Sequence, residues 1–389
     1  MKIAFLTDGI YPYVIGGMQK HSYYLAKFFA QNKVNVDLYH CVPFGKPLVE
    51  KLEGFSEDEL KYIKHTCIHF PAPGIIPGHY LQESWKYSSK LFVLLKNKLS
   101  DYDFIYAKGF TAWKLLAEKV RGLNCPPIGL NFHGFEMFQT PPSIKSRFEQ
   151  LILKDPVKWN CAKADYVFSY GGKITAVIKN KVNIETKKII EMPSGIETGW
   201  VNEQIKSKAD PIKFLFVGRY ERRKGIQELN KVLKGLIGEF NFEFNFIGPI
   251  PNYKKISSKK VIYHGSIFDQ QKIKKIMRAC DVLVCPSHSE GMPNVILEGM
   301  ASGLAIIATD VGAVCEMVNE SNGWLINAGK ETALKNAMIS AINTANKDLM
   351  RFKYNSLEKV KSCFLWNRIG QETTELVSEL IKKRNTLID

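Results

Sequence analysis

The feature that most constrains the fold is a regular alternation of short apolar runs with longer segments of helical periodicity. Runs of Val, Ile, Leu and Phe predict strands buried on both faces, as in parallel sheets covered by helices. The alternation extends along the chain and therefore predicts an α/β fold. The predicted strands cover residues 2–7, 34–40, 103–107, 127–131, 165–169, 189–192, 212–217, 242–247, 260–263, 281–285 and 304–308. The predicted helices cover residues 18–32, 80–99, 110–121, 144–162, 171–181, 224–238, 269–279, 293–302, 312–318 and 330–348.

A polar stretch that contains Pro and Gly divides this pattern into two halves. Such composition is typical of a connection between domains, so we predict a linker at 193–210. It would join a first domain, residues 1–192, to a second domain, residues 211–354. A chain of 389 residues is long enough for each half to bury a core of its own. The pattern therefore predicts two Rossmann-like domains that face each other across a cleft.

The chain is strongly basic, with 54 Lys and Arg against 38 Asp and Glu and a net charge of +16. The excess is spread over both halves, which favours anionic partners such as phosphorylated small molecules, anionic lipid headgroups or nucleic acid. The sequence has no RNA-recognition signature, helix-turn-helix or zinc finger. We therefore expect no nucleic-acid partner, and we expect an anionic membrane surface as a candidate partner.

The sequence patterns also indicate a cellular setting. No run of eighteen uncharged apolar residues occurs, so no spanning helix is predicted. Asp8 follows the first apolar run too closely for a signal peptide. The eight cysteines are scattered without a Cys-x-x-Cys pair, which argues against a zinc site or a disulfide framework. We therefore predict a cytoplasmic protein without a metal, with attachment to the inner face of the cell membrane as a further option.

Two predicted helices combine apolar and basic residues in a way that can suit a membrane surface. For residues 85–98, a core helix with lysines that reach the solvent is the favoured interpretation. For residues 144–159 both interpretations stay open, because Lys145, Arg147 and Lys158 stand beside apolar residues.

Two carboxylates, Glu290 and Glu298, are separated by seven residues at a predicted loop-to-helix junction. The junction lies between the predicted strands 281–285 and 304–308, so it belongs to a βαβ unit whose helix start is a usual ligand site. Pro293 suits the first helical turn, where its missing N–H costs nothing. Around it we expect a ligand to meet Gly291, Met292, Pro293, Asn294 and Val295.

A basic turn follows the first strand of the second half. The strand ends in Gly218, and Arg219 and Lys224 follow it before the next helix. An Arg fork and a Lys point charge at a strand end suit a diphosphate. Arg222 and Arg223 are expected to be exposed and are given no role.

Three further candidates follow predicted strands. Gly16 and Gly17 open a helix after the first strand and would let the backbone approach a phosphate, although neither a G-x-G-x-x-G nor a Walker A pattern is present. His133 and Glu136 follow the strand 127–131, at an end that would face the cleft. His264 follows the strand 260–263.

The stretch from Ser287 to Gly312 reads S-x-x-E-G-x-P-x-x-x-x-E-x-M-A-x-G, then an apolar strand and T-D-x-G. It resembles the E-x7-E signature of the retaining glycosyltransferases of family 4, which have the GT-B fold. The resemblance implies that Glu290 contacts the donor sugar and Glu298 the ribose. It implies that Arg219 and Lys224 hold the diphosphate.

The same resemblance assigns roles in the first half. It implies that Gly16 and Gly17 contact the donor's distal phosphate or the acceptor, and that His133 lies near the reacting centre. His264 would lie in the loop that contacts the base. Glu197 stands where the family usually has Asp, which puts a direct ligand role in doubt. The final helices, about 355–389, would cross back to the first domain.

The implied reaction is a metal-independent transfer of a hexose, with retention, from a nucleotide sugar to a glycan or lipid-linked acceptor. UDP is the expected nucleotide, no further cofactor is implied, and the setting would be surface-polysaccharide or glycoconjugate synthesis. The residues expected to act in catalysis are His133, Arg219, Lys224 and Glu290.

Two alternatives stay open. A sugar-nucleotide epimerase or a phosphorylase could share the fold, but the first needs additional acid and base carboxylates and the second a pyridoxal lysine. A non-catalytic nucleic-acid or membrane binder would account for the basic charge, and it predicts salt-sensitive binding without turnover of a nucleotide sugar.

Overall fold

The structure, a computed structural model, describes residues 1–75 and 78–388. Residue 389, the last of the predicted crossing segment, lies outside the described residues. Two sheets are present, with strand orders β3-β2-β1-β4-β5-β6-β7 and β10-β9-β8-β11-β12-β13. Within both sheets the paired strands run parallel. The order 3-2-1-4-5-6 is that of a doubly wound sheet, so the predicted α/β fold with two Rossmann-like halves is confirmed.

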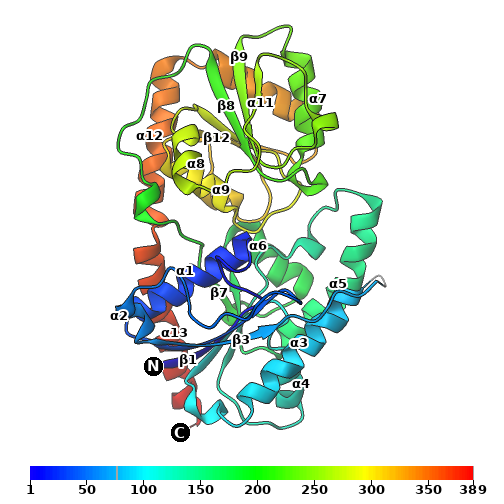
Figure 1. Ribbon diagram of the computed structural model, residues 1–389, viewed down its shortest axis with the longest axis vertical. Coiled ribbons are helices and arrows are strands. Elements are labelled where there is room, and N and C mark those ends of the chain that lie inside the picture. Colours follow the sequence, from blue (N-terminus) through cyan, green and yellow to red (C-terminus); the bar gives the residue numbers. More distant parts are fainter. Residues whose placement is uncertain (76–77, 389) are drawn as a thin grey trace.

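The first sheet and its helices occupy the lower part of Figure 1. Its strands are β1 (Lys2–Leu6), β2 (Asn35–Val42), β3 (Ile63–His69), β4 (Phe104–Lys108), β5 (Ile128–Asn131), β6 (Tyr166–Ser169) and β7 (Ile189–Glu191). Its helices are α1 (Gly17–Gln31), α2 (Glu57–Leu60), α3 (His79–Leu95), α4 (Trp113–Val120), α5 (Ile144–Lys163) and α6 (Gly172–Val177).

The second sheet and its helices occupy the upper part of Figure 1. Its strands are β8 (Ile212–Val217), β9 (Phe242–Ile247), β10 (Val261–Tyr263), β11 (Val282–Cys285), β12 (Ala305–Thr309) and β13 (Gly323–Ile326). Its helices are α7 (Ile226–Leu236), α8 (Gln270–Met277), α9 (Asn294–Ala301), α10 (Val314–Met317), α11 (Glu331–Asn343) and α12 (Asn346–Cys363). The last helix of the chain, α13 (Trp366–Ile388), lies in the lower part of the figure.

The sequence patterns missed two strands, β3 and β13, which lie at the edges of their sheets. β3 is an edge strand whose side chains are mostly half-buried, so it lacks a continuous apolar run. β13 is an edge strand of the second sheet. The single helix predicted for 330–348 is wrong, because α11 ends at Asn343 and α12 begins at Asn346.

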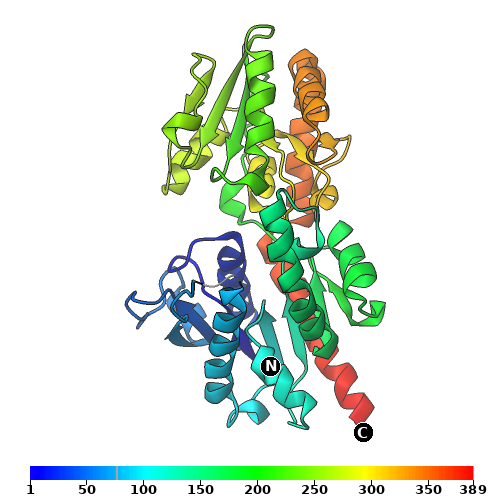
Figure 2. The same cartoon turned by 90° about the vertical axis from the view of Figure 1, so that its right-hand side faces the viewer.

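The last two helices connect the two halves. α12 lies beside the second sheet and α13 beside the first, along the left side of Figure 1, and Figure 2 shows the same path from a second side. Trp366 at the start of α13 stacks on Phe28 of α1, with ring centroids 5.9 Å apart. Val377 and Leu380 are buried in the core of the first half. Among the described residues, no helix is long and apolar enough to cross a membrane.

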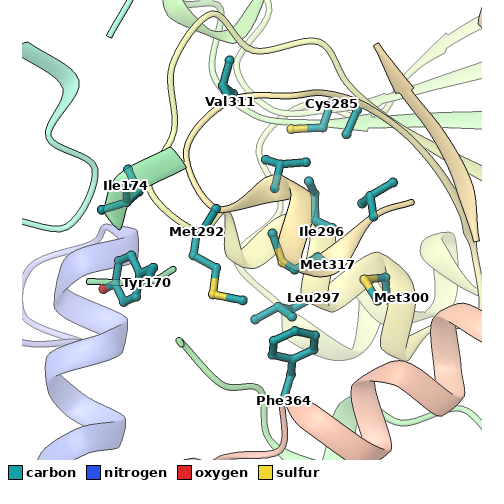
Figure 3. Close-up of a cluster of buried hydrophobic side chains, with 14 of the residues drawn as sticks. Tyr170, Ile174, Cys285, Met292, Ile296, Leu297, Met300, Val311, Met317 and Phe364 are labelled. Carbon is teal, nitrogen blue, oxygen red and sulfur yellow. The ribbon is translucent and has the colours of Figure 1, made fainter. Parts of the chain in front are cut away.

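The chain passes between the halves twice, and the two passages lie side by side. Ile196 N–H donates to Phe364 O (2.8 Å), and Trp366 N–H donates to Ile196 O (3.0 Å). One buried apolar cluster includes Tyr170 and Ile174 from the first half with Met292 from the second (Figure 3). The two halves are therefore in direct contact, and the carboxyl ends of both sets of strands meet at this junction.

Candidate active site

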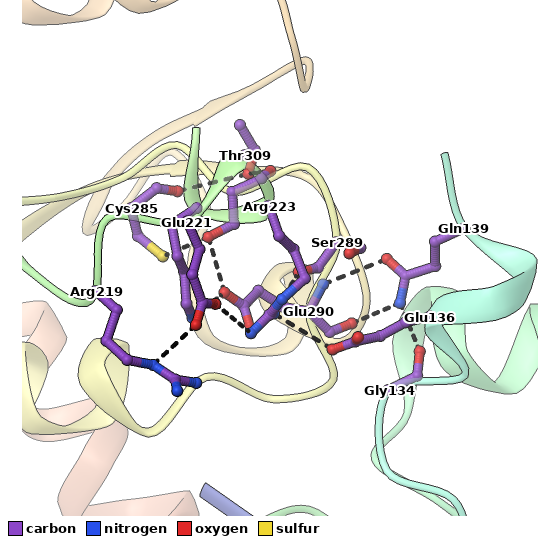
Figure 4. Close-up of polar contacts among 12 residues, drawn as sticks. Gly134, Glu136, Gln139, Arg219, Glu221, Arg223, Cys285, Ser289, Glu290 and Thr309 are labelled. Atoms are coloured by element: carbon purple, nitrogen blue, oxygen red, sulfur yellow. Dashed lines mark hydrogen bonds and ion pairs between the residues drawn. The ribbon is translucent and has the colours of Figure 1, made fainter. Parts of the chain in front are cut away.

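Glu290 is the centre of a buried ionic group at the loop between β11 and α9 (Figure 4). The residue is only 6% exposed. Lys224 Nζ lies 2.6 Å from Glu290 Oε1, and Arg223 contacts Oε2 at 3.0 Å. Ser287 Oγ donates to Oε1 at 2.8 Å. Glu290 and Lys224, two of the predicted site residues, therefore lie together.

The two cations decide the ionisation of this carboxylate. Burial raises the pKa of Glu290, but Lys224 and Arg223 lower it by more, so the net pKa falls below the usual value. Glu290 is therefore ionised at neutral pH. Glu136 of the first half lies 3.3 Å from Arg223, and burial raises the pKa of Glu136 despite this cation.

The expectation that Arg222 and Arg223 are exposed is wrong. The segment after Gly218 forms a 3-10 turn, Arg222–Lys224, which turns these side chains into the structure. Arg222 contacts Glu228 (2.6 Å) and His288 (2.7 Å). A run of charges in the sequence does not reveal such a turn, because each residue alone is typical of a solvated loop.

Arg219 and Gly218 lie at the end of β8. The Arg219 side chain is 73% exposed, and its Nε lies 2.9 Å from Glu221 Oε1, outside the Glu290 group. Gly218 lies against Gly248, whose φ is +139° and where a Cβ would come within 1.9 Å of Gly218 O. This close approach of two strand ends requires glycine at position 248.

Glu298 faces the first half. It lies on α9, and Lys20 Nζ of α1 contacts its Oε1 at 3.2 Å. Glu298 raises the pKa of Lys20. A methyl group at Gly17 would lie 3.9 Å from Asn294 Nδ2, so the Gly16–Gly17 turn and the start of α9 are neighbours across the junction.

Little space remains beside Glu298. The cavity there has a volume of about 20 Å³ and is lined by Lys20, Tyr24, Glu197 and Asn294, among others. Tyr24 Oη donates to Glu197 Oε2 at 2.7 Å. A ligand larger than a water molecule would therefore need Lys20 to leave Glu298, or the halves to move apart, before it could occupy this place.

The start of α9 differs slightly from the prediction. Pro293 is the N-cap residue, outside the first turn, because α9 begins at Asn294. The N–H groups of the first turn have no partner within the helix and can bind an anion. Met292 and Val295 pack into the apolar cluster between the halves.

His133 lies in a buried group of ionisable residues. Its Nδ1 forms a hydrogen bond with Tyr170 Oη, and its ring meets that of His21 at 5.3 Å between centroids. Burial, with Lys108 and His21 nearby, lowers the pKa of His133 well below the usual value. The imidazole is therefore neutral at neutral pH. Its Nε2 is buried and has no hydrogen-bond partner among the described residues.

The two halves touch through their backbones beside this group. A Cβ at Gly134 would come within 3.0 Å of Gly291 N, and one at Gly291 within 3.1 Å of Gly134 Cα. Gln139 Nε2 donates to Gly134 O (2.5 Å) and to Glu290 O (2.6 Å). Gln139 therefore links the His133 loop to the Glu290 loop, a role that the sequence did not indicate.

A larger cavity than the one beside Glu298 lies elsewhere, between α8 and the β8–β9 part of the second sheet. Its volume is about 670 Å³, and Lys213, Glu243, Asn245 and His264 are among its lining residues. His264 Nε2 and Asn245 Oδ1 are 2.7 Å apart. Cavity size alone would favour this place, but Lys213 and Glu243 stand at or near the amino ends of their strands. We therefore place the candidate site at the carboxyl ends, where ligands of such sheets bind.

The described residues offer no cluster that could hold a metal. Within residues 1–75 and 78–388, no group of three or more His, Cys, Asp or Glu could bind a metal ion. The Asp-x-Asp triplet at Asp101 and Asp103 precedes β4, at the amino end of the first sheet. Asp103 there accepts a hydrogen bond from Lys2 N–H at 2.7 Å.

Lys20 and His21 were not among the predicted site residues. They follow Gly16–Gly17 on the same helix, and this position was the signal that could have found them. Lys108, at the end of β4, is buried with its Nζ 2.9 Å from His21 Nδ1, and burial lowers its pKa well below the usual value.

Comparisons with known proteins identify the family of the chain. Residues 211–344 match the family "Glycosyl transferases group 1", and residues 15–200 match "Glycosyltransferase Family 4". Together these matches cover more than half of the chain. The chain is 30% identical over 248 residues to an uncharacterized glycosyltransferase, MJ1178 of Methanocaldococcus jannaschii, covering 60% of this chain and 66% of that protein.

The name of a second relative states the process in which that protein acts. The chain is 25% identical over 177 residues to the capsular polysaccharide biosynthesis glycosyltransferase CapM of Staphylococcus aureus. This match covers 43% of the chain and 46% of CapM. The chain thus spans less than two thirds of the length of these two relatives.

Solved structures share the whole fold at low identity. Sucrose-phosphate synthase from Thermosynechococcus elongatus superposes with a TM-score of 0.77 at 18% identity, covering 98% of this chain and 99% of the other. Alr3699/HepE of Anabaena, in complex with UDP-glucose, superposes with a TM-score of 0.63 at 17% identity, covering 97% and 100%. The chain has the GT-B fold and belongs to the group 1, family 4 glycosyltransferases.

Proposed function

We propose that this protein transfers a hexose, with retention and without a metal, from a UDP-sugar to a glycan or lipid-linked acceptor. The observation that carries the proposal is the ionised Glu290 held by Lys224 and Arg223 beside the start of α9. The cations and the helix start form a site for a diphosphate, and the carboxylate lies where the attached sugar would sit.

The main electrostatic task of such a transfer is to stabilise the departing diphosphate. Lys224 and Arg223 are already fixed by Glu290, so little reorganisation is needed when negative charge develops. Arg219 would join them by leaving Glu221. Glu290 would position the sugar, and the departing phosphate would take the acceptor's proton in a front-face displacement. This route needs no protein nucleophile.

The first half would complete the site from the other side. His133 is neutral, and Nε2 has no partner among the described residues, so it can bind a sugar hydroxyl. Gly16 and Gly17 would allow the backbone to approach the donor phosphate or the acceptor. Closure of the halves over the donor would exclude water and limit hydrolysis.

The choice of UDP is supported by solved structures with the same fold. HepE was crystallised with UDP-glucose, and an Escherichia coli protein described as trehalose-6-phosphate was bound with UDP-2-fluoro glucose. The name of CapM supports a role in surface polysaccharide synthesis. We propose a UDP-sugar donor and a role in surface polysaccharide synthesis for this chain as well. We also propose that the protein attaches to the inner face of the cell membrane.

A thermal-shift panel of UDP, GDP, ADP and their sugars tests the donor class. A ligand at a hundredfold excess over its Kd adds about 2.7 kcal/mol to the free energy of unfolding. We expect UDP and one or more UDP-sugars to raise Tm by several degrees. If no nucleotide raises Tm, the proposal is wrong. If only GDP or ADP does, the choice of base is wrong.

Glu298→Ala should weaken the binding of UDP by about tenfold to a hundredfold, because hydrogen bonds to a charged group contribute about 1.5–3 kcal/mol. Isothermal titration calorimetry measures the change. Glu331→Ala is the matched control, since this carboxylate of the same half is 43% exposed and pairs with Lys231. Equal UDP affinity in Glu298→Ala and the control would remove Glu298 from the site.

A further inference from the structure

The first part of α5 carries a stripe of large apolar side chains that the protein leaves uncovered. Ile144 is 78% exposed, Phe148 64%, Leu151 53% and Ile152 43%. Their spacing of three and four residues places them on one face of the helix. Single exposed apolar residues are common, but a contiguous group of this kind marks an interaction site. These four residues are called the α5 stripe below.

Basic residues stand on both sides of the α5 stripe. At roughly 100° per residue, Lys145 lies about 60° to one side of Phe148, and Arg147 lies about 100° to the other side. Lys154 and Lys158 fall on the same side as Arg147. The Lys145 side chain is 87% exposed. An apolar stripe with cations along both borders is the pattern of a helix that lies in a membrane interface.

The acidic residues of this segment do not cancel the pattern. Glu149 lies 3.9 Å from Lys145 and is 61% exposed, so the pair is loose and solvated. Asp155 is exposed and lies on the same helix face as the α5 stripe, one turn after Leu151, so the apolar stripe ends there.

One neighbour of the α5 stripe comes from outside the helix. A methyl group at Gly78 would lie 3.6 Å from Ile152 Cγ2, so this residue lies against the α5 stripe. α5 lies at the right of the first half in Figure 1, away from α12 and α13.

We propose that the α5 stripe inserts into the interfacial layer of an anionic phospholipid bilayer. The choice of occupant rests on charge complementarity, because the flanking cations and the net charge of +16 match anionic headgroups. Lysine and arginine side chains can reach the headgroups while the apolar side chains enter the acyl region. A partner protein could cover the α5 stripe only with a groove that has acidic walls on both sides. The experiment below distinguishes such a partner from a bilayer.

The opposite face of α5 contacts the candidate active site. Gln150 of α5 donates through Nε2 to Glu136 O at 2.9 Å, and the Glu136 carboxylate contacts Arg223. Gln150 stands about 160° around the helix from Phe148, so a bilayer that holds the α5 stripe would lie across α5 from the rim of the site. This part of the inference rests on the proposed function: the acceptor would be a lipid-linked glycan presented from that bilayer.

Co-sedimentation with vesicles tests the docking. The probe is phosphatidylcholine vesicles with about one third phosphatidylglycerol, compared with phosphatidylcholine alone. We expect the wild type to bind the anionic vesicles, and the double variant Phe148→Ser/Leu151→Ser to bind about tenfold more weakly. Tyr253→Ser is the matched control, since this aromatic side chain of the second half is 83% exposed. All variants should keep the wild-type Tm, because these side chains are exposed.

Several results would overturn the docking. The first is that the wild type does not bind anionic vesicles. The second is that the double variant binds as tightly as the wild type, including the case in which binding depends on salt but is unchanged by the apolar substitutions. Protection of the α5 stripe by a protein partner, without vesicle binding, would also overturn it.

The failure of the proposed function is separable from the failure of docking. The double variant should keep the wild-type Tm rise with UDP, since Phe148 and Leu151 are exposed and are not among the proposed donor-site residues. Vesicle binding that depends on the α5 stripe, without any nucleotide effect, would uphold the docking and reject the proposed function.

Discussion

Lys224→Ala should lower the kcat of donor-dependent transfer by about 10²–10³-fold, the usual loss when one fixed group that stabilises developing charge is removed. Lys224 Nζ lies 2.6 Å from Glu290, so the variant removes both a cation for the diphosphate and a fixed partner of the carboxylate. The release of UDP from a UDP-sugar, followed in a coupled assay, measures the change.

The control for this variant is Lys231→Ala. Lys231 lies on α7, close in the chain, but its side chain is 69% exposed and pairs with Glu331. It should keep near-normal turnover. Tm should be recorded for both variants, because Glu290 without Lys224 is a buried charge with Arg223 and Ser287 as its remaining partners. A folded Lys224→Ala variant with near-normal turnover would contradict the site assignment.

Asp281→Ala should lower the free energy of unfolding by about 3–5 kcal/mol, because it leaves a buried lysine without its charge partner. Asp281 Oδ1 and Lys353 Nζ are 2.6 Å apart, and both side chains are 2% exposed. Asp281 also accepts the N–H of Lys213 at 2.8 Å, so it joins α12 to the start of β8. Urea unfolding followed by circular dichroism measures the loss.

Two variants make this prediction specific. Lys361→Ala breaks an exposed pair of α12 with Glu203, and it should change stability by no more than about 1 kcal/mol. Asp281→Leu/Lys353→Met replaces the pair by apolar residues, and it should recover much of the loss. If Asp281→Ala unfolds at the same urea concentration as Lys361→Ala, the pair does not hold α12 in place.

The central strands were predictable because their apolar runs are uninterrupted. β8 and β9 begin and end at the predicted residues, and their inward side chains are buried phenylalanines and aliphatic residues. The edge strand β3 was not predictable, since a strand with one neighbour carries polar residues such as Lys64 and His65. A local pattern cannot identify a strand that is defined mainly by its pairing.

The site was predictable to the extent that it depends on strand ends. Parallel strands bring their carboxyl ends to one edge, so Lys224 and Glu290 could be expected to meet. Contacts that depend on the relative placement of the halves were not predictable. Lys20 with Glu298, and Gln139 with Glu290, join residues more than a hundred positions apart through a junction that no periodicity encodes.

The most direct test of the proposed donor site is a crystal structure with UDP or a non-transferable UDP-sugar bound. We predict that the ribose hydroxyls bind Glu298 in place of Lys20, and that the diphosphate contacts Lys224 and the first amides of α9. The sugar should lie between Glu290 and His133. A nucleotide bound instead in the cavity between α8 and β9, with the Lys20–Glu298 pair intact, would contradict the account.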